Sequence, residues 1–154
     1  MAFAAGYYAY YELGNGSSIQ QEYEHEVAAM EASRKAAAPA LTFPDMTHLN
    51  VALKSGERIG AGKIVFQGKC ISCHGDHGQG IIGPNLTDDY WIHGDGKPES
   101  IANTIHDGVS AKGMPPWNTL LSDEEIYSVT AYVKSLRGTN PPGAKAAQGE
   151  LVKE

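Results

Sequence analysis

The apolar positions between residues 50 and 138 follow helical spacing, and the clearest helix is predicted from Ser122 to Leu136. It opens with the capping-box sequence Ser122-Asp123-Glu124-Glu125, and Gly138 stands beyond its end as a C-terminal cap. A second helix is predicted from Pro98 to Val109, with the proline in its first turn. The apolar faces that these two helices would bury are Ile126, Val129, Tyr132, Val133 and Leu136, and Ile101, Ile105 and Val109.

A third helix, from Ser55 to Lys69, contains two glycines, Gly60 and Gly62. Each lowers the intrinsic stability of a helix by roughly 1 kcal/mol, so glycine at these positions needs a packing reason. The close approach of the 122–136 helix would supply one. The pattern as a whole predicts an all-α fold.

The segment before these helices is more polar. Ile19 to about Ala37 predicts an amphipathic helix with one narrow apolar stripe, formed by Ile19, Tyr23, Val27 and Met30. Pro39 ends it, and the chain up to Asn50 has few helix signals, which predicts an irregular linker. We therefore expect an amphipathic helix and linker at 14–50, the main domain at 51–138 and a C-terminal tail at 139–154.

Residues 1–13 are apolar or aromatic apart from Glu12, and they include Tyr7, Tyr8, Tyr10 and Tyr11. Tyrosine is enriched where a membrane helix meets water, so this stretch predicts the end of a membrane anchor. Spanning a bilayer takes about 20 apolar residues, so the stretch would not cross alone. A soluble amphipathic segment, or a helix packed on a partner, is the alternative.

Charge narrows the choice of partners. The chain has 154 residues, a net charge of -6 and no long basic run. This composition argues against a nucleic-acid partner and against binding to anionic membrane surfaces through charge.

The segment Cys70-Ile71-Ser72-Cys73-His74 has the C-x-x-C-H spacing that attaches haem c covalently. Two thiols on the first turn of a helix can both reach vinyl groups on one edge of a porphyrin, which leaves thioether bonds. The adjacent His74 then supplies one axial ligand to the iron. One motif predicts one haem c, and because haem is attached outside the cytoplasmic membrane in families with this motif, it predicts a periplasmic or extracytoplasmic location.

The alternative is a redox or zinc-binding cysteine pair beside an unrelated histidine. A thioredoxin-like pair would need a surrounding βαβ pattern, whereas both flanks here predict helix and loop. A structural zinc site would need two further ligands, and the chain has no other cysteine.

Met114 is the predicted second axial ligand. It lies in Lys112-Gly113-Met114-Pro115-Pro116-Trp117, where two prolines stiffen the loop. A thioether is a soft, neutral donor, and pairing it with histidine raises the reduction potential. A lone methionine is more often core filler, and Met30 and Met46 are assigned that role. His106, on the helix before this loop, is the competing ligand.

Residues 54–138 resemble a class I cytochrome c domain in the order of their parts. The first helix has Gly62 and Phe66, the attachment motif and a proline follow, Met114 comes next, and the last helix has Tyr132. The resemblance implies a fold wrapped around one haem c. It also implies that Pro84 offers its backbone carbonyl to the second nitrogen of His74, and that Gly62, Phe66 and Tyr132 mark the crossing of the terminal helices.

Two segments, 83–94 and 138–145, are similar to the haem-c subunit of cbb-type oxygen reductases, the C family of haem-copper terminal oxidases. In that family the subunit is anchored by membrane helices and its haem domain lies in the periplasm. The common form has two haem domains in tandem, whereas this chain has a single C-x-x-C-H motif.

The resemblance implies an electron relay that performs no bond chemistry itself. A soluble redox protein would be the donor and the catalytic subunit of the oxidase the acceptor. Tyr90, Trp91 and Trp117 are expected to donate hydrogen bonds to the haem propionates, with simple packing as the alternative. A free-standing cytochrome c shuttle would have the same haem domain, whereas an enzyme or gas sensor would need the iron position that Met114 closes.

Overall fold

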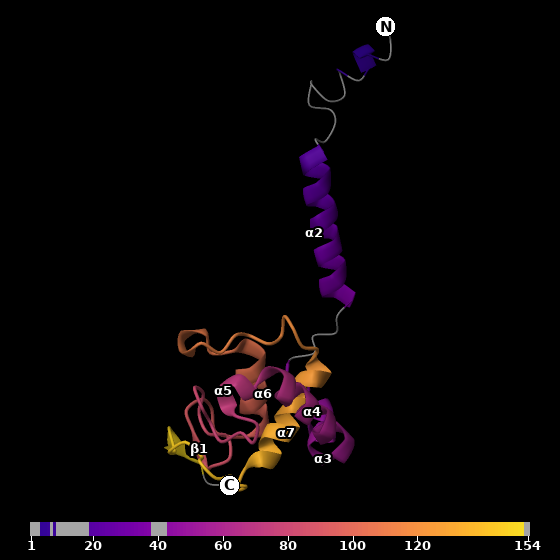
Figure 1. Cartoon of the computed structure of the whole chain (residues 1–154). Coiled ribbons are helices and arrows are strands. Elements are labelled where there is room, and N and C mark those ends of the chain that lie inside the picture. Colours follow the sequence, from indigo (N-terminus) through magenta and orange to yellow (C-terminus); the bar gives the residue numbers. More distant parts are fainter. Residues whose placement is uncertain (1–3, 7, 9–18, 38–42, 153–154) are drawn as a thin grey trace. The chain divides into compact units, whose positions relative to one another are not determined.

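The structure is a computed structural model that describes residues 4–6, 8, 19–37 and 43–152 (Figure 1). The chain divides into two compact units, Met1–Leu41 and Thr42–Glu154. In the first unit, helix α2 spans Ile19–Ala37, the bounds predicted from the sequence. Within the described part of the chain, no helix has both the length and the apolar character needed to span a bilayer. The anchor predicted at residues 1–13 falls mostly outside the described residues and stays a prediction.

The second unit is mostly helical, with one short sheet. Its elements are α3 (Met46–Lys54), α4 (Gly56–Lys69), α5 (Ile71–His74), β1 (Tyr90–Trp91), α6 (Pro98–Asp107), a 3-10 turn η1 (Ser110–Lys112), α7 (Asp123–Leu136) and β2 (Glu150–Leu151). The capping box predicted for α7 is present, because Ser122 and Glu125 bond each other's side chain and backbone. Three of the predicted helices are therefore confirmed within two residues of their expected ends, as α4, α6 and α7.

Helices α4 and α7 cross at Gly62. A Cβ atom at this position would collide with the backbone carbonyl of Ser128, so only glycine permits the approach. Beside the crossing, the rings of Phe66 and Tyr132 lie 5.2 Å apart between centroids. The packing reason expected for both glycines is confirmed for Gly62 and is wrong for Gly60, where an added Cβ atom would meet nothing within 4 Å. The main core, hereafter the α4/α7 core, consists of Phe66, Ile101, Val129, Tyr132, Val133 and Leu136.

The second half of the predicted linker is helical, which corrects the expectation of an irregular chain up to Asn50. Asp45 caps α3, because its carboxylate accepts hydrogen bonds from the backbone nitrogens of Thr47 (2.8 Å) and His48 (3.4 Å). Leu49 and Ala52 are buried with Ala102, Tyr127 and Ala131 in a second cluster, hereafter the α3 core. Helix α3 has only nine residues, so the spacing of its apolar positions is too short a pattern to predict a helix. Its stability comes from tertiary packing.

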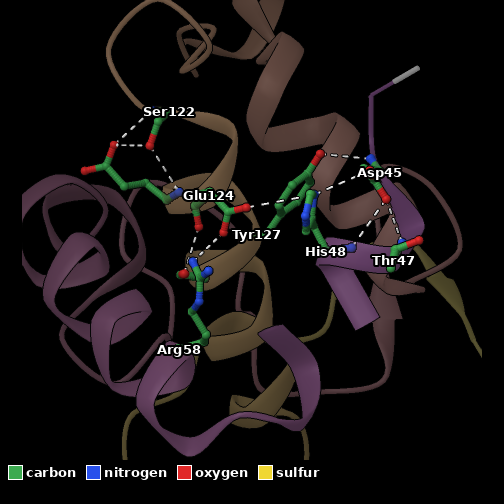
Figure 2. Close-up of polar contacts among 9 residues, drawn as sticks. Asp45, Thr47, His48, Arg58, Ser122, Glu124 and Tyr127 are labelled. Atoms are coloured by element: carbon green, nitrogen blue, oxygen red, sulfur yellow. Dashed lines mark hydrogen bonds and ion pairs between the residues drawn. The ribbon is translucent and has the colours of Figure 1, made fainter. Parts of the chain in front are cut away.

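Side chains of α7 tie α3 and α4 together (Figure 2). The Tyr127 hydroxyl accepts a hydrogen bond of 2.8 Å from the Asp45 backbone nitrogen. Glu124 forms an ion pair with Arg58 of α4, and its carboxylate lies 3.9 Å from the His48 ring of α3. The helix before α4 is thus part of the haem-domain unit rather than a tether to it.

The C-terminal tail folds back onto the domain. Strand β2 pairs antiparallel with β1, with Tyr90 opposite Leu151 and Trp91 opposite Glu150, and the yellow C-terminal strand lies beside β1 in Figure 1. Arg137 fixes this return, because its Nε donates to Asp89 (2.6 Å) and its Nη2 to the carbonyl of Val152 (2.8 Å). The predicted all-α fold is therefore corrected to a mostly helical fold with a two-stranded ladder.

Candidate haem site

The attachment motif forms a tight helical turn directly after α4. Cys70 ends α4 and begins α5, and its carbonyl accepts hydrogen bonds from the backbone nitrogens of Cys73 (3.2 Å) and His74 (2.9 Å). Both cysteines are half-buried free thiols. Burial, and to a lesser extent the neighbouring Cys73, raises the pKa of the Cys70 thiol to about 11. The structure thus brings both predicted attachment residues and His74 into one turn.

The His74 ring is held by its edge and by its face. Its Nδ1 lies 3.0 Å from the carbonyl oxygen of Pro84, the contact that the resemblance implies. A carbonyl only accepts, so Nδ1 carries the proton and Nε2 of the neutral ring keeps a lone pair. Burial lowers the pKa of His74, the Pro84 hydrogen bond opposes that shift, and the charge of Lys145 adds to it. The outcome is a neutral imidazole, the form that binds a metal.

Glycine at position 83 lets the loop backbone lie against the His74 ring. A Cβ atom there would come within 2.8 Å of Cε1, 3.0 Å of Nδ1 and 3.1 Å of Nε2. From the sequence, Gly83 has no predicted role beyond its place in the family resemblance. The signal was its position directly before the proline whose carbonyl orients the ring.

The loop after α5 returns to the attachment turn. The carbonyl of Cys73 accepts hydrogen bonds from Ile81 (3.0 Å) and Gly83 (2.9 Å), and that of His74 accepts one of 2.7 Å from Gly80. These hydrogen bonds place Pro84 next to the His74 ring. The loop is thus a rigid part of the site, although no side chain within residues 75–83 was predicted to act in it.

Met114 lies half-buried in a turn that closes on the end of α6. Its backbone forms an isolated antiparallel bridge with Val109, with hydrogen bonds of 2.8 and 3.2 Å. Gly108 has a φ of 68°, and a Cβ atom there would collide with the backbone of Pro115 and Pro116. The Trp117 backbone nitrogen donates to the carbonyl of Ile105 at 3.2 Å. The loop that carries the predicted second ligand is therefore closely constrained.

His106 lies in different surroundings from Met114. Its ring stacks on Phe43 at a centroid distance of 4.1 Å, and its Nδ1 lies 2.6 Å from a carboxylate oxygen of Asp107. Asn118 Nδ2 also approaches Nδ1, at 3.3 Å. Phe43 in turn stacks on Tyr127 and packs against the α3 core. The His106 side chain thus packs next to the α3 core, and the choice of Met114 over His106 as the second ligand stays a prediction.

Trp91 offers an observation that tests whether haem fits here. Its indole Nε1 is buried and has no hydrogen-bond acceptor among the residues that the structure describes. Its ring packs against the α4/α7 core, as do Cys70, Leu86 and Ile105. A buried N–H without an acceptor costs about 1–3 kcal/mol, and a haem propionate would supply one. Two free thiols, a neutral imidazole with an available nitrogen and an orphaned donor together fit haem c.

The other two predicted propionate donors are less constrained. Tyr90 is 38% exposed, and its backbone nitrogen donates to the Asp88 carboxylate at 2.9 Å. Trp117 is half-buried on the Met114 loop. For both, a bond to the cofactor stays a prediction.

Comparison with known proteins points in the same direction as the site. Residues 57–133 match the protein-family model described as "Cytochrome C oxidase, cbb3-type, subunit III". The cbb3-type cytochrome c oxidase subunit FixP of Sinorhizobium medicae is 41% identical over 103 residues, in an alignment that covers 61% of this chain and 35% of that protein. Subunit CcoP of Rubrivivax gelatinosus is 33% identical over 153 residues, covering 96% of this chain and 49% of that protein. The chain thus spans about a third to a half of the length of these relatives.

Among solved structures, cytochrome cL of Methylophaga aminisulfidivorans aligns with a TM-score of 0.49 and 32% sequence identity. The alignment covers 55% of this chain and 57% of that one.

Proposed function

This chain belongs to the family of subunit III of cbb3-type cytochrome c oxidases, whose cofactor is covalent haem c, and on that premise we propose that it relays single electrons through one haem c toward the catalytic subunit of a terminal oxidase. Thioether bonds from Cys70 and Cys73 attach the haem. His74 Nε2 and Met114 Sδ would be the protein ligands of its iron. The observation that carries this assignment is the His74 ring directly after the two cysteines, with Nδ1 bonded to Pro84 at 3.0 Å and Nε2 left as a ligand.

The protein's own residues serve to hold and to enclose the site. Haem supplies the reversible one-electron change of an iron ion. Pro84 orients His74, burial favours its neutral form, and Met114 would supply the second ligand, which would leave no open iron position for oxygen. Cys70 of the attachment motif packs against the α4/α7 core. The chain is therefore an electron-transfer component and not itself a catalyst.

The organisation of the relay follows the family resemblance. The domain at 51–138 holds the haem on the periplasmic or extracytoplasmic side of the membrane, and residues 1–13 belong to its anchor. Residues 14–41 connect the anchor to the unit that begins at Thr42, because α3 is part of that unit. A soluble redox protein delivers the electron. The haem propionates accept hydrogen bonds from Trp91, Tyr90 and Trp117. The Nε1 of Trp91, which is buried and has no acceptor within the described part of the chain, supports the bond from Trp91.

One preparation tests the proposal. The chain is matured in a host that attaches haem c, and a pyridine haemochrome spectrum and a redox titration are recorded. We expect one haem c per chain, no release of haem into acidified organic solvent, and the long-wavelength ferric band of methionine–iron ligation. Colourless protein, or reduced protein that binds carbon monoxide readily, would contradict the relay.

The same host tests the place of the chain in the cell. We expect the protein in the membrane fraction, co-purifying with the oxidase catalytic subunit. Recovery of the whole protein in the periplasmic fluid would identify a free-standing cytochrome shuttle instead.

A further inference from the structure

Lys145, in the C-terminal tail, binds the loop that orients His74. Its ammonium donates hydrogen bonds to the carbonyl oxygens of Ile82 (3.1 Å) and Gly83 (3.2 Å), the two residues directly before Pro84. These partners lie 62 and 63 positions away in the sequence, so the contact is a tertiary one. Hydrogen bonds from a charged donor are stronger than hydrogen bonds between neutral groups.

The backbone of Lys145 is fixed on the same loop. Its nitrogen donates to the carbonyl of Gln79 at 2.8 Å, and its carbonyl accepts a bond of 3.3 Å from the side chain of Asn85. Asn85 is itself buried and accepts two hydrogen bonds from Thr87. The backbone position of Lys145 is therefore fixed by hydrogen bonds, and this position places its side chain within bonding distance of Ile82 and Gly83.

The segment that Lys145 holds is the one that sets the orientation of the His74 ring. Gly83 lies against the ring face, and the Pro84 carbonyl accepts a hydrogen bond from Nδ1–H. A carbonyl partner that holds the second nitrogen of a ligating histidine fixes the ring and adjusts its strength as a ligand. The ammonium also places a positive charge beside the histidine, where it stabilises the electron-rich, reduced state of a bound iron.

We propose that Lys145 is a positioning residue for His74, which holds the Ile82–Pro84 backbone against the imidazole and raises the reduction potential of the haem by its charge. The inference rests on the proposed function, because it needs His74 to be an iron ligand. It assigns to the C-terminal tail a role in the redox site, beyond the pairing of β2 with β1.

The test compares variants of the whole haem-loaded chain. Lys145→Met removes the charge and both donors, and Lys145→Arg keeps the charge. Lys54→Met is the matched control, because it removes the same charge from the exposed end of α3. The midpoint potential is measured by redox titration. The exchange of the His74 Nδ1 proton with solvent is measured by NMR in the diamagnetic reduced state.

We expect Lys145→Met to lower the midpoint potential by clearly more than Lys54→Met does, and Lys145→Arg to return it close to the wild-type value. The Nδ1 proton of the Lys145→Met variant should exchange about tenfold faster, because the loop that shields it opens more often. A lysine that only stabilises the loop would change the melting temperature but leave the potential of the folded protein unchanged. Equal shifts in Lys145→Met and Lys54→Met would overturn the proposal.

A second variant keeps the test decisive if Lys145→Met does not retain haem. Lys145→Gln removes the charge and keeps an N–H donor, and it too should lower the potential; an unchanged potential in this variant would count against the proposal. The wild-type spectrum separates the two levels of inference. If the wild type lacks histidine–methionine ligation, the proposed function fails. If the wild type has it and the Lys145 series is flat, only the role of Lys145 fails.

Discussion

The two sides of the candidate haem site are built differently. His74 depends on a segment distant in sequence, since the Pro84 carbonyl accepts a hydrogen bond from Nδ1–H and Lys145 of the tail binds the backbone next to that proline. Met114 is held locally, by the bridge to Val109 and by two prolines packed against Gly108. Distant contacts are lost only when a large part of the fold opens, whereas a local turn can open alone. We therefore expect His74 to be essential for holding the haem, and Met114 to be a ligand that the site can lose while the haem is retained.

The largest expected effect comes from removing the histidine. His74→Ala leaves the Pro84 carbonyl without its partner and the attachment turn without its ligand. We expect the variant to mature poorly, with about tenfold less covalent haem per chain than the wild type. Haem content is read from the pyridine haemochrome spectrum against total protein. A normal yield of haem would show that His74 is not essential for holding the haem.

Met114→Ala should have a smaller and different effect. The two cysteines and His74 remain, so covalent haem should be retained at close to the wild-type amount. The sixth position opens, so the ferric methionine–iron band disappears, the midpoint potential falls and the reduced protein binds carbon monoxide. His106→Ala is the matched control and should leave all three readouts unchanged. An intact methionine band in Met114→Ala would show that another residue is the ligand.

Glycines on the two sides allow a finer comparison. Gly83→Ala would bring a Cβ against the His74 ring, and Gly108→Ala would combine a φ of 68° with a collision against Pro115. Each should lower the free energy of unfolding by about 2–3 kcal/mol. Gly113→Ala is the control, because its φ is 82° but an added Cβ would meet no atom within 4 Å, so only backbone strain of about 1 kcal/mol applies.

Spectroscopy of the same variants distinguishes effects on the Met114 ligand from effects on the His74 ligand. Gly108→Ala should weaken the methionine–iron band, whereas Gly83→Ala should leave that band and shift the ring signals of His74 in the reduced protein. Stability is measured by denaturant unfolding followed by far-ultraviolet circular dichroism. Equal changes at both ligands in both variants would mean that the two sides are mechanically coupled, contrary to the comparison.

The difference between the two sides also bears on how much the sequence predicts. Local signals were sufficient for α7, where the capping box at Ser122 marks the start of the helix and the apolar face marks its buried side. The attachment turn could be recognised from its five residues. The orientation of His74 by Pro84 came only with the family resemblance, because a backbone carbonyl ten positions away has no signature in composition or periodicity.

Features that depend on distant packing were not predictable. Helix α3 exists because Leu49 and Ala52 are buried against α6 and α7, and the tail is ordered because it pairs with β1 and Lys145 reaches the His74 loop. The expectation that Gly60 serves a helix crossing was wrong for a related reason. Gly60 and Gly62 look alike in the sequence, and only their direction relative to α7 separates them.

The smallest expected effect concerns Trp91, which can be assigned to neither side from its own contacts. Trp91→Phe keeps an aromatic ring against the α4/α7 core and removes the buried Nε1 donor. The loss of volume lowers stability whether or not the donor has a partner, so stability alone does not decide its role. A hydrogen bond to a propionate partly neutralises that carboxylate, so its removal should lower the midpoint potential slightly. Val65→Ala is the control, because it removes volume from a side chain packed against the same α4/α7 core without removing a hydrogen-bond donor. A potential that falls in Trp91→Phe and not in Val65→Ala would make Trp91 a hydrogen-bond donor to the cofactor, whereas equal potentials in the two variants would leave it as a packing residue.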